Sequence, residues 1–576
     1  MSNLELYKQP LNETRAISNL KEMLEQSCSL FGEKPAFFVH SQNNEEYIPI
    51  SYNQLKKDTD SFGTALLDKG LKGKRIAVIG ENRYEWAVTY FAVVNGVGVI
   101  VPIDKELPEN EIESLIVRSE AEAVVFSGKL QSAFENLAQK IESVKHYICM
   151  DLEEDKGKIQ SYNKLVEYGE KLLKEGNRDF SDTVIDNEIM SIMLFTSGTT
   201  DASKAVMLSH RNISSNIMDM GKMVKFGKKD DVVLSVLPMH HTYECTGGFL
   251  LQIYSGATIA FCQGLRHIVK NLQQSKATIM LTVPLIAESI YKKIWEQAAK
   301  DPKKYKKLKF GIAISNFLLK FRIDIRRKLF KPIHDTLGGN LRLLISGAAG
   351  IDPEVAKGFR EFGILAIQGY GLTECSPLVA VNRDEDFRDA SIGLPPPNVE
   401  VKIVDKNEEG IGELVAKGPN VMIGYYKNEE ATQEVLKDGW FYTGDLGYID
   451  KDGFMYITGR KKYLIVTKNG KNIYPEELET LVNKALFVKE SMVYGKRDED
   501  GDTLVCAEIV INKEYLEEKY GDALNNELIN SLAAEEIKKI NHSIPLYKHI
   551  RQFNIREEEF QKTTTKKIKR YLENTK

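Results

Sequence analysis

The residues with the clearest capacity for chemistry form a loop at positions 196–204, between two apolar runs. Residues 192–195 and 205–208 are apolar, as expected of buried strands. The loop residues that offer hydroxyls, little bulk or an ammonium are Thr196, Ser197, Gly198, Thr199, Thr200 and Lys204. Backbone N–H groups, hydroxyls and one cation that converge on a point suit a polyphosphate. The alternative is an ordinary Ser/Thr-rich turn with a solvated lysine.

This loop is not a Walker A motif. That motif requires Gly-Lys-Ser/Thr at the start of a helix, whereas here Ser203 precedes Lys204 and Ala205 follows it. Asp201 also places a carboxylate beside a loop meant for anions. The loop alone therefore leaves ATP binding open.

A second motif follows an apolar strand at residues 366–377. Its residues suited to a nucleotide are Gly369, Tyr370, Gly371, Thr373 and Glu374. The glycines let the backbone approach a flat ligand on which the tyrosine can stack. The glutamate is a hard oxygen ligand suited to Mg²⁺. The motif therefore indicates a nucleotide and its metal.

These motifs need a scaffold that brings strand ends together. Residues 75–126 alternate strand, helix and strand, which predicts parallel sheets covered by helices. The predicted strand at 232–238 ends at His240 and His241, and strand ends of such sheets bind ligands. Two polar loop histidines are the alternative. Gly247 and Gly248 then begin an apolar helix and leave room for an acyl chain or for helix packing.

Residues 291–331 are strongly basic, with apolar residues interleaved at helical spacing. A basic amphipathic helix can lie on an anionic membrane. We prefer a solvated face on a helix whose apolar side packs inward, because most such stripes do so. No other part of the chain supports a nucleic-acid interpretation.

The composition is that of a globular protein. Of the 576 residues 42% are hydrophobic and 28% are charged, and the net charge of −4 gives no general attraction to nucleic acid. The six cysteines form no C-x-x-C pair, which favours a reducing compartment such as the cytoplasm. We expect no signal peptide, and we expect the apolar run at 86–103 to be a buried helix and strand, because Gly96 and Gly98 interrupt it.

The motifs together resemble the adenylate-forming superfamily, which contains acyl-CoA synthetases, peptide-synthetase adenylation domains and firefly luciferase. The resemblance spans about residues 35–570, and the form Gly-Tyr-Gly-Leu-Thr-Glu-x-Ser-Pro looks most like long-chain fatty acid–CoA ligases. The chain departs from the family pattern at Asp201, Ser203 and Ala205 in the loop, and at Gln561 and Lys566 near the C-terminus.

The resemblance implies an α/β fold. It implies a large N-terminal domain of stacked α/β sheets with a β-barrel subdomain, over residues 1–460. A small mobile α+β C-terminal domain, residues 461–576, would carry the catalytic lysine. Lys462 falls on the hinge position of the family.

The resemblance also assigns roles to residues. Lys567, Lys204 and Glu374 would be catalytic, and Thr196 and Glu374 would hold Mg²⁺. His241, Gly247 and Gly248 would lie beside the acyl substrate. The expected nucleotide contacts are Thr196, Ser197, Gly198, Thr199, Thr200, Lys204, Gly347, Ala348, Gly369, Tyr370, Gly371, Thr373, Asp445, Arg460 and Lys567.

The implied activity is an ATP-dependent acid–thiol ligation that adenylates a fatty acid and transfers the acyl group to CoA. Two alternatives stay open. The acceptor could be the phosphopantetheine of an acyl carrier protein acting in trans. Less favoured is a non-catalytic nucleotide- or acyl-binding homologue, for which Asp201 is the only hint. Peripheral membrane contact is compatible with a ligase that uses CoA and with one that uses a carrier protein.

Overall fold

The computed structural model describes residues 10–41, 46–196, 203–227, 230–467, 471–497, 503–562 and 568–570. The chain divides into two compact units. Unit 1 comprises Met1–Val401, Ala416–Phe441 and Asp452–Phe454, and unit 2 comprises Lys402–Val415, Tyr442–Lys451 and Met455–Lys576. The domain boundary expected at residue 460 stays a prediction.

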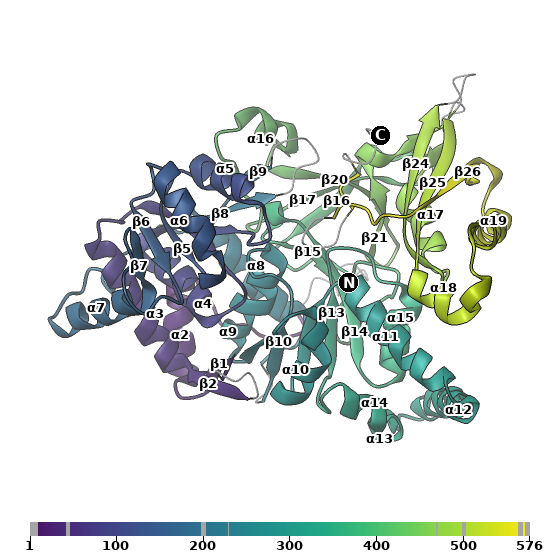
Figure 1. Cartoon of the computed structure of the whole chain (residues 1–576), viewed down its shortest axis with the longest axis horizontal. Helices are drawn as coiled ribbons and strands as arrows, with labels where there is room; N and C mark the ends of the chain where they lie inside the picture. Colours follow the sequence, from purple (N-terminus) through teal and green to yellow (C-terminus); the bar gives the residue numbers. More distant parts are fainter. Residues whose placement is uncertain are drawn as a thin grey trace. The chain divides into compact units, whose positions relative to one another are not determined.

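Unit 1 is built on two eight-stranded sheets, as the strand–helix alternation predicts (Figure 1). The first sheet has the order β15-β14-β13-β12-β10-β11-β1-β2 and is parallel from β14 to β1. Its strands are β1 (Pro35–His40), β2 (Tyr47–Ser51), β10 (Val232–Ser235), β11 (Thr258–Phe261), β12 (Ile279–Thr282), β13 (Leu343–Ser346), β14 (Leu365–Gly371) and β15 (Leu378–Val381).

The second sheet has the order β18-β9-β8-β4-β3-β5-β6-β7 and is parallel from β8 to β7. Its strands are β3 (Lys74–Ile79), β4 (Gly98–Ile103), β5 (Ala121–Phe126), β6 (His146–Cys149), β7 (Ile159–Ser161), β8 (Met190–Thr196), β9 (Lys204–Ser209) and β18 (Gly424–Tyr425). β8 and β9 pair antiparallel, which confirms the predicted strand–loop–strand around the hydroxyl-rich loop.

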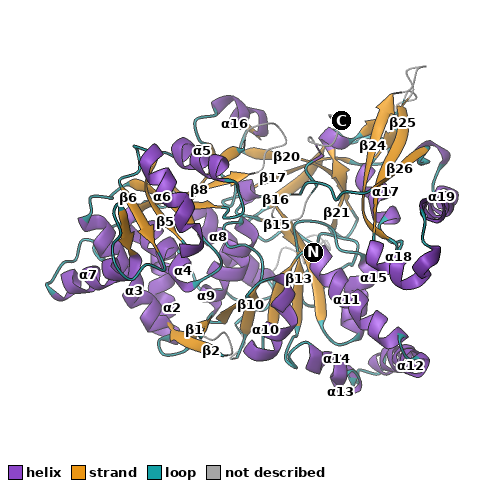
Figure 2. Ribbon diagram, viewed as in Figure 1, coloured by secondary structure: helices purple, strands orange, loops and turns teal. Residues whose placement is uncertain are grey.

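Helices cover both sheets (Figure 2). A capping box formed by Ser209 and Asn212 starts α8 directly after β9. Trp86, Tyr90 and Phe91 pack on Phe249 and form an aromatic core among the helices. The helices of unit 1 are α2 (Leu20–Phe31), α3 (Tyr52–Asp68), α4 (Tyr84–Ala92), α5 (Glu109–Ser119), α6 (Gln131–Lys140), α7 (Tyr162–Lys174), α8 (His210–Met223), α9 (Leu251–Ser255), α10 (Ile268–Ser275), α11 (Pro284–Ala299), α12 (Pro302–Leu319), α13 (Arg326–Leu329), α14 (Lys331–Thr336), α15 (Pro353–Glu361) and α16 (Glu429–Val435).

Two short π-helices interrupt this helical layer, η1 (Val93–Val97) and η3 (Tyr243–Leu250). The apolar run at 86–103 is therefore α4, η1 and the buried strand β4, as predicted. No helix in the described ranges is long and apolar enough to span a membrane.

The β-rich part predicted as a barrel subdomain is observed as a five-stranded sheet. It has the order β16-β17-β20-β19, with β21 beside β20. Its strands are β16 (Glu400–Val404), β17 (Gly412–Lys417), β19 (Leu436–Lys437), β20 (Trp440–Ile449) and β21 (Met455–Arg460).

The rest of unit 2 is a small α+β assembly with its own apolar core. Buried residues of α17, β24, β25 and α19 form this core. The elements are β22 (Ile465–Val466), β23 (Asn472–Ile473), α17 (Pro475–Val482), β24 (Val488–Arg497), β25 (Thr503–Ile511), α18 (Lys513–Tyr520), α19 (Asn526–Ser543) and β26 (Gln552–Arg556).

Candidate active site

The carboxyl ends of β13 and β14 in the first sheet bring the Gly347–Ala348 turn and the Gly369–Gly371 segment to one edge. Thr282, Ser346 and Gln368 lie side by side across β12, β13 and β14. The N–H of Gly347 donates to the carbonyl of Thr282 at 3.0 Å. The small-residue turn after β13 therefore lies beside the Gly369–Gly371 end of β14, where a ligand of an α/β sheet is expected.

Gly371 is a glycine for a steric reason. A Cβ atom at this position would lie 2.1 Å from the carbonyl oxygen of Pro377. Leu372 N–H donates to the same oxygen at 2.9 Å. The backbone therefore passes close to Pro377 and then forms the short 3₁₀ turn Thr373–Cys375, which contains the half-buried Glu374. The backbone thus fixes where the predicted metal ligand stands.

Tyr425 contacts both Lys204 and Glu374. Lys204 Nζ lies 4.8 Å from the centroid of the Tyr425 ring. The Tyr425 hydroxyl donates a 2.8 Å hydrogen bond to Glu374 Oε1. Burial, and after it the charge of Glu374, raises the pKa of this hydroxyl, so it remains a neutral donor. The two strongest motifs of the sequence therefore share one aromatic neighbour.

The short strand β18 holds Tyr425 in this position. Tyr425 pairs with Val206 of β9, and Tyr426 N–H donates to the carbonyl of Ala205 at 2.8 Å. At the other end of the segment, Met422 N–H donates to the carbonyl of Glu374 at 2.8 Å. Sequence reasoning missed Tyr425. Its only sequence signal is a Tyr-Tyr pair after Gly424, far along the chain from both motifs.

The histidine segment lies where the two sheets of unit 1 meet. His240 Nε2 lies 3.6 Å from a carboxylate oxygen of Asp104, which follows β4. Burial, and then Lys105, lowers the pKa of His240 to about 3, so the imidazole is neutral at pH 7. The ring of His241 lies 4.1 Å from that of His240. The predicted substrate histidine therefore has a buried, uncharged neighbour.

Asn82, which follows β3 of the second sheet, forms hydrogen bonds with the segment that leads to the histidines. Its side-chain amide donates to Ser235 Oγ at 2.9 Å and to the carbonyl of Leu237 at 2.7 Å. Its carbonyl oxygen accepts from Met239 N–H at 2.9 Å. Two of these bonds fix the backbone that leads to the histidines, and the third holds the side chain of Ser235.

The predicted acyl-binding glycines lie within η3. A Cβ atom on Gly248 would lie 2.5 Å from the carboxyl carbon of Glu244, and one on Gly247 would lie 3.0 Å from Leu281 Cδ2. Glu244 is fully buried and accepts a 2.6 Å hydrogen bond from Ser235. Burial raises the pKa of Glu244 to about 8. In this structure, protein side chains line the space beside both glycines.

Gly347 and Ala348 continue the same surface. A Cβ atom on Gly347 would lie 2.9 Å from the ring of Tyr243, whose hydroxyl donates to the carbonyl of Ile345 at 2.8 Å. Ala348 has a φ of +69°, a conformation that a tight turn imposes on a small residue.

In unit 2, Asp445 and Arg460 form an ion pair. They are opposite one another on β20 and β21, and Arg460 Nε lies 2.6 Å from Asp445 Oδ1. The Asp445 side chain is buried and that of Arg460 is partly exposed. Burial, and then Arg460, lowers the pKa of Lys462 to about 8. Asp445, Arg460 and Lys462 thus form one charged group within unit 2.

Six predicted residues lie outside the described residues. They are Ser197, Gly198, Thr199, Thr200, Asp201 and Lys567. Thr196 and Lys204, which flank the loop, face one another across β8 and β9. The Thr196 hydroxyl donates to the carbonyl of Lys204 at 3.4 Å.

The donor set of unit 1 fits a magnesium nucleotide. The described residues contain no group of three or more His, Cys, Asp or Glu suited to a metal. Mg²⁺ does not require one, since it usually takes one or two carboxylates and completes its shell with water and phosphate oxygens. Glu374 would provide the carboxylate, Thr196 a hydroxyl and Lys204 an ammonium for phosphate.

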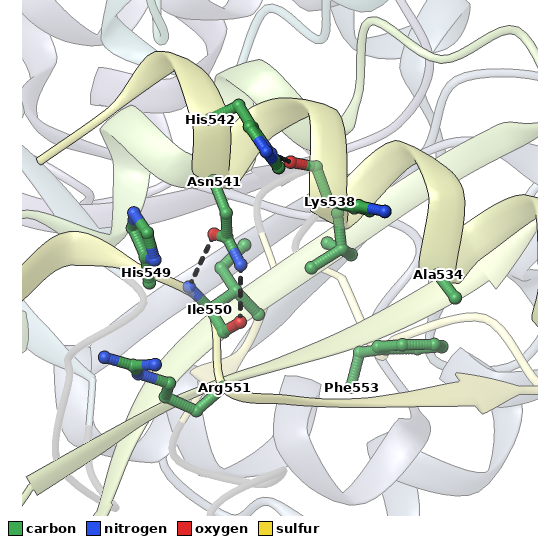
Figure 3. Close-up of a pocket in the computed structure, with 9 residues that line it drawn as sticks. Ala534, Lys538, Asn541, His542, His549, Ile550, Arg551 and Phe553 are labelled. Carbon is green, nitrogen blue, oxygen red and sulfur yellow. Dashed lines mark hydrogen bonds between the residues drawn. The ribbon is translucent and has the colours of Figure 1, made fainter. Parts of the chain in front are cut away.

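A separate hollow in unit 2 contains none of the predicted residues (Figure 3). Asn541 of α19 exchanges two 2.9 Å hydrogen bonds with the backbone of Ile550 at its centre. His542, His549 and Arg551 lie around it. It has no carboxylate among its lining residues and is not part of the candidate active site.

Comparison with known proteins shows the family to which the chain belongs. A family model described as "AMP-binding enzyme" matches residues 24–426. The chain belongs to this family. The matched range includes the loop, the Glu374 motif and Tyr425, so the family match covers the whole cluster in unit 1.

Two family relatives are similar over most of their length. Long-chain-fatty-acid–CoA ligase 5 of Rattus norvegicus is 31% identical, over 79% of this chain and 70% of that protein. Fatty acyl-CoA synthetase B of Dictyostelium discoideum is 27% identical, over 84% of this chain and 76% of that protein. The solved structure of anthranilate CoA ligase AuaEII in complex with anthranoyl-AMP has the same fold, with a TM-score of 0.76, 18% identity, and coverage of 100% of this chain and 98% of that one.

Proposed function

We propose that this protein is an ATP-dependent fatty acid–CoA ligase that releases AMP and pyrophosphate. The observation that carries the proposal is the cluster of Lys204, Tyr425 and Glu374, in which one tyrosine contacts both the lysine proposed to bind phosphate and the glutamate proposed to hold Mg²⁺. The names of the relatives, a long-chain-fatty-acid–CoA ligase and a fatty acyl-CoA synthetase, support the substrate class.

The reaction has two half-reactions. In the first, a carboxylate oxygen of the acid bonds to the α-phosphorus of ATP, and the bond to the β-phosphate oxygen breaks to release pyrophosphate. In the second, the thiol sulfur bonds to the acyl carbon, its proton is lost, and AMP leaves. Because one anion attacks another, charge neutralisation is the main requirement of the first step.

The residues of unit 1 meet that requirement in our proposal. Lys204 binds phosphate oxygens, and Glu374 and Thr196 hold Mg²⁺, which supplies further positive charge. Tyr425 orients the Glu374 carboxylate through its hydroxyl, and the ring of Tyr370 stacks on the adenine. Gly347, Ala348, Gly369, Gly371 and Thr373 provide backbone and hydroxyl contacts around the nucleotide.

The residues of unit 2 have separate roles in the proposal. Asp445 accepts hydrogen bonds from the two ribose hydroxyls, as one carboxylate can. Arg460 contacts ribose or phosphate, Lys462 is the hinge residue, and Lys567 assists adenylation. His241, Gly247 and Gly248 of unit 1 lie beside the acyl group. These assignments rest on the match of each residue to the family pattern.

The acceptor and the location are further parts of the proposal. CoA is the proposed acceptor, and a carrier-protein phosphopantetheine acting in trans is the second candidate because its thiol has the same chemistry. All six cysteines are free thiols, which supports a reducing compartment such as the cytoplasm.

Product analysis tests the proposal. The purified protein is incubated with ATP, Mg²⁺ and acids of graded chain length, with CoA or holo-acyl carrier protein as the acceptor. We expect acyl-CoA, AMP and pyrophosphate, with each added buried methylene contributing up to about 0.8 kcal/mol until the site is full. A preference for acetate or an aromatic acid would reject the fatty-acid assignment. Thioester formation with the carrier protein but not with CoA would show that the carrier protein is the acceptor.

A further inference from the structure

Helix α12 exposes large aromatic side chains. The exposed fractions are 67% for Phe310, 58% for Phe317 and 63% for Phe321, which lies in the turn after the helix. Our preference for an inward-packed apolar side is therefore wrong for Phe317 and Phe321, although Phe330 of the same basic stretch is buried. Single exposed apolar residues are ordinary, but three exposed phenylalanines on one helix and the turn after it are not.

The attachment of α12 to unit 1 does not use these side chains. Its buried residues are Gly311 and Ser315, which at 100° per residue point away from Phe310 and Phe317 by at least about 100°. A Cβ atom on Gly311 would lie 3.3 Å from the ring of Phe330, and Asn316 donates to Glu361 of α15 at 2.8 Å. The helix is thus apolar on two sides, and only the inner side packs against its own unit.

The outer side of α12 also carries positive charge. At 100° per residue, positions 303, 306, 307, 310, 314 and 317 share one face. We name Lys303, Lys306, Lys307, Phe310, Ile314, Phe317 and the adjoining Phe321 the α12 outer face. Within the described residues, none of these three lysines forms an ion pair with a carboxylate. The nearby Asp301 caps the helix by accepting from Lys303 N–H.

The surroundings of the face extend the same chemistry. Ile323 and Leu329 are 50% and 38% exposed and follow α12 along the chain. Lys320, Arg322 and Lys328 are exposed as well. Figure 1 draws α12 at the margin of unit 1, next to α13 and α14. Along the chain, exposed cations therefore lie on both sides of the exposed phenylalanines, and the carboxylate of Asp324 pairs with Arg326.

We propose that the α12 outer face docks the protein on an anionic phospholipid bilayer. Phenylalanines on a helix that lies in the interface insert among acyl chains, while lysines reach the phosphates of the head groups. The aliphatic Ile314, Ile323 and Leu329 favour acyl chains over nucleic-acid bases, on which they cannot stack. The docking does not depend on ligase activity, although it would bring the enzyme to the phase in which long-chain acids accumulate.

Vesicle binding tests the docking. The full chain is sedimented with unilamellar vesicles of phosphatidylglycerol and phosphatidylcholine, and with vesicles of phosphatidylcholine alone. We expect binding to the anionic vesicles that weakens with added salt. The triple variant K303Q/K306Q/K307Q should bind these vesicles at least tenfold more weakly, as should F310S/F317S/F321S.

A matched control removes the same charge elsewhere. Lys72, Lys406 and Lys484 are exposed lysines on other elements, and K72Q/K406Q/K484Q should bind like the wild type. All variants should keep the wild-type thermal unfolding midpoint, because the substituted side chains are exposed. An equal loss in the control variant, or wild-type protein that ignores anionic vesicles, would overturn the proposal. So would a dimer that dissociates in the phenylalanine variant, because the face would then bind a second copy, and so would tighter binding to nucleic acid than to vesicles.

Discussion

At the scale of single residues, the proposed adenylation site depends on Tyr425, whose hydroxyl contacts Glu374 and whose ring lies beside Lys204. Tyr425→Phe keeps the ring and removes the hydrogen bond. We expect the rate of adenylation to fall about tenfold, corresponding to about 1.4 kcal/mol for one bond to a charged group, with a higher Mg²⁺ requirement.

Tyr426 offers a matched control for this change. Its hydroxyl donates to Glu120 at 3.0 Å, on the other side of the segment. Tyr426→Phe should leave adenylation and its Mg²⁺ dependence unchanged. Equal effects of the two substitutions would show that Tyr425 acts only through the stability of β18.

A second prediction concerns the buried Glu244, whose pKa is raised from 4.5 to about 8 by burial. The folded state holds the proton more tightly than the unfolded state, so the contribution to stability is complete below pH 4.5 and is lost as pH rises through 8. Glu244→Gln should remove this loss, so its advantage in stability over the wild type should grow between these limits and reach about 4 kcal/mol near pH 8.

Chemical denaturation at a series of pH values measures this difference. The exposed Glu408→Gln should leave the pH dependence unaltered. Parallel pH profiles of the wild type and Glu244→Gln would mean that Glu244 is charged in the folded protein. Tyr243 and Cys245, which flank it in the sequence, do not change charge in this range, because burial raises the pKa of each.

Lys204 and Glu374 could be selected from the sequence as candidate site residues, because each lies in a short motif whose residue types indicate a particular chemistry. Tyr425 could not, because its role arises from the pairing of β18 with β9, two segments that are distant in the chain. The raised pKa of Glu244 was equally inaccessible, since it follows from burial in η3 rather than from local sequence.

At the scale of elements, the connection between the two sheets of unit 1 is the feature that positions the histidine segment. Asn82→Ala removes three hydrogen bonds to that segment. We expect a loss of about 1–3 kcal/mol in the free energy of unfolding, because Met239 N–H loses its acceptor. Asn53→Ala, which removes one exposed bond to Glu33, should cost much less. Equal losses would show that Asn82 has no special part in joining the sheets.

Elements were predictable wherever the apolar period was local: it predicts helices over residues 109–119 and 210–223, and these are the bounds of α5 and α8. The apolar helix expected to begin at Gly247 and Gly248 instead starts at Tyr243 as a π-helix, and both glycines lie within it. The period of α12 indicated a helix but not which side is covered, since that depends on neighbours such as Phe330.

At the scale of the whole molecule, the proposal assigns Lys567 to the first half-reaction only. A mobile ammonium can bridge the carboxylate and the α-phosphate and then leave. Lys567→Ala should lower adenylation by a factor of about a hundred or more, as for the loss of one preorganised charge. With preformed acyl-adenylate and thiol, the variant should make thioester at nearly the wild-type rate.

Lys566→Gly is the control for this assignment, because Lys566 occupies the family's glycine position. It should change neither half-reaction greatly. Equal losses in both half-reactions for Lys567→Ala would indicate a structural role. A larger loss for Lys566→Gly would move the catalytic lysine by one residue.

The most direct test of the account is the exchange of labelled pyrophosphate into ATP without any thiol. Reversible adenylation of a fatty acid predicts exchange that requires both the acid and Mg²⁺. It also predicts that Glu374→Gln, which keeps the shape of the side chain and removes its charge, abolishes most of the exchange. If no acid supports exchange, or if exchange in Glu374→Gln equals that of the wild type with unchanged Mg²⁺ dependence, the proposed adenylation site is wrong.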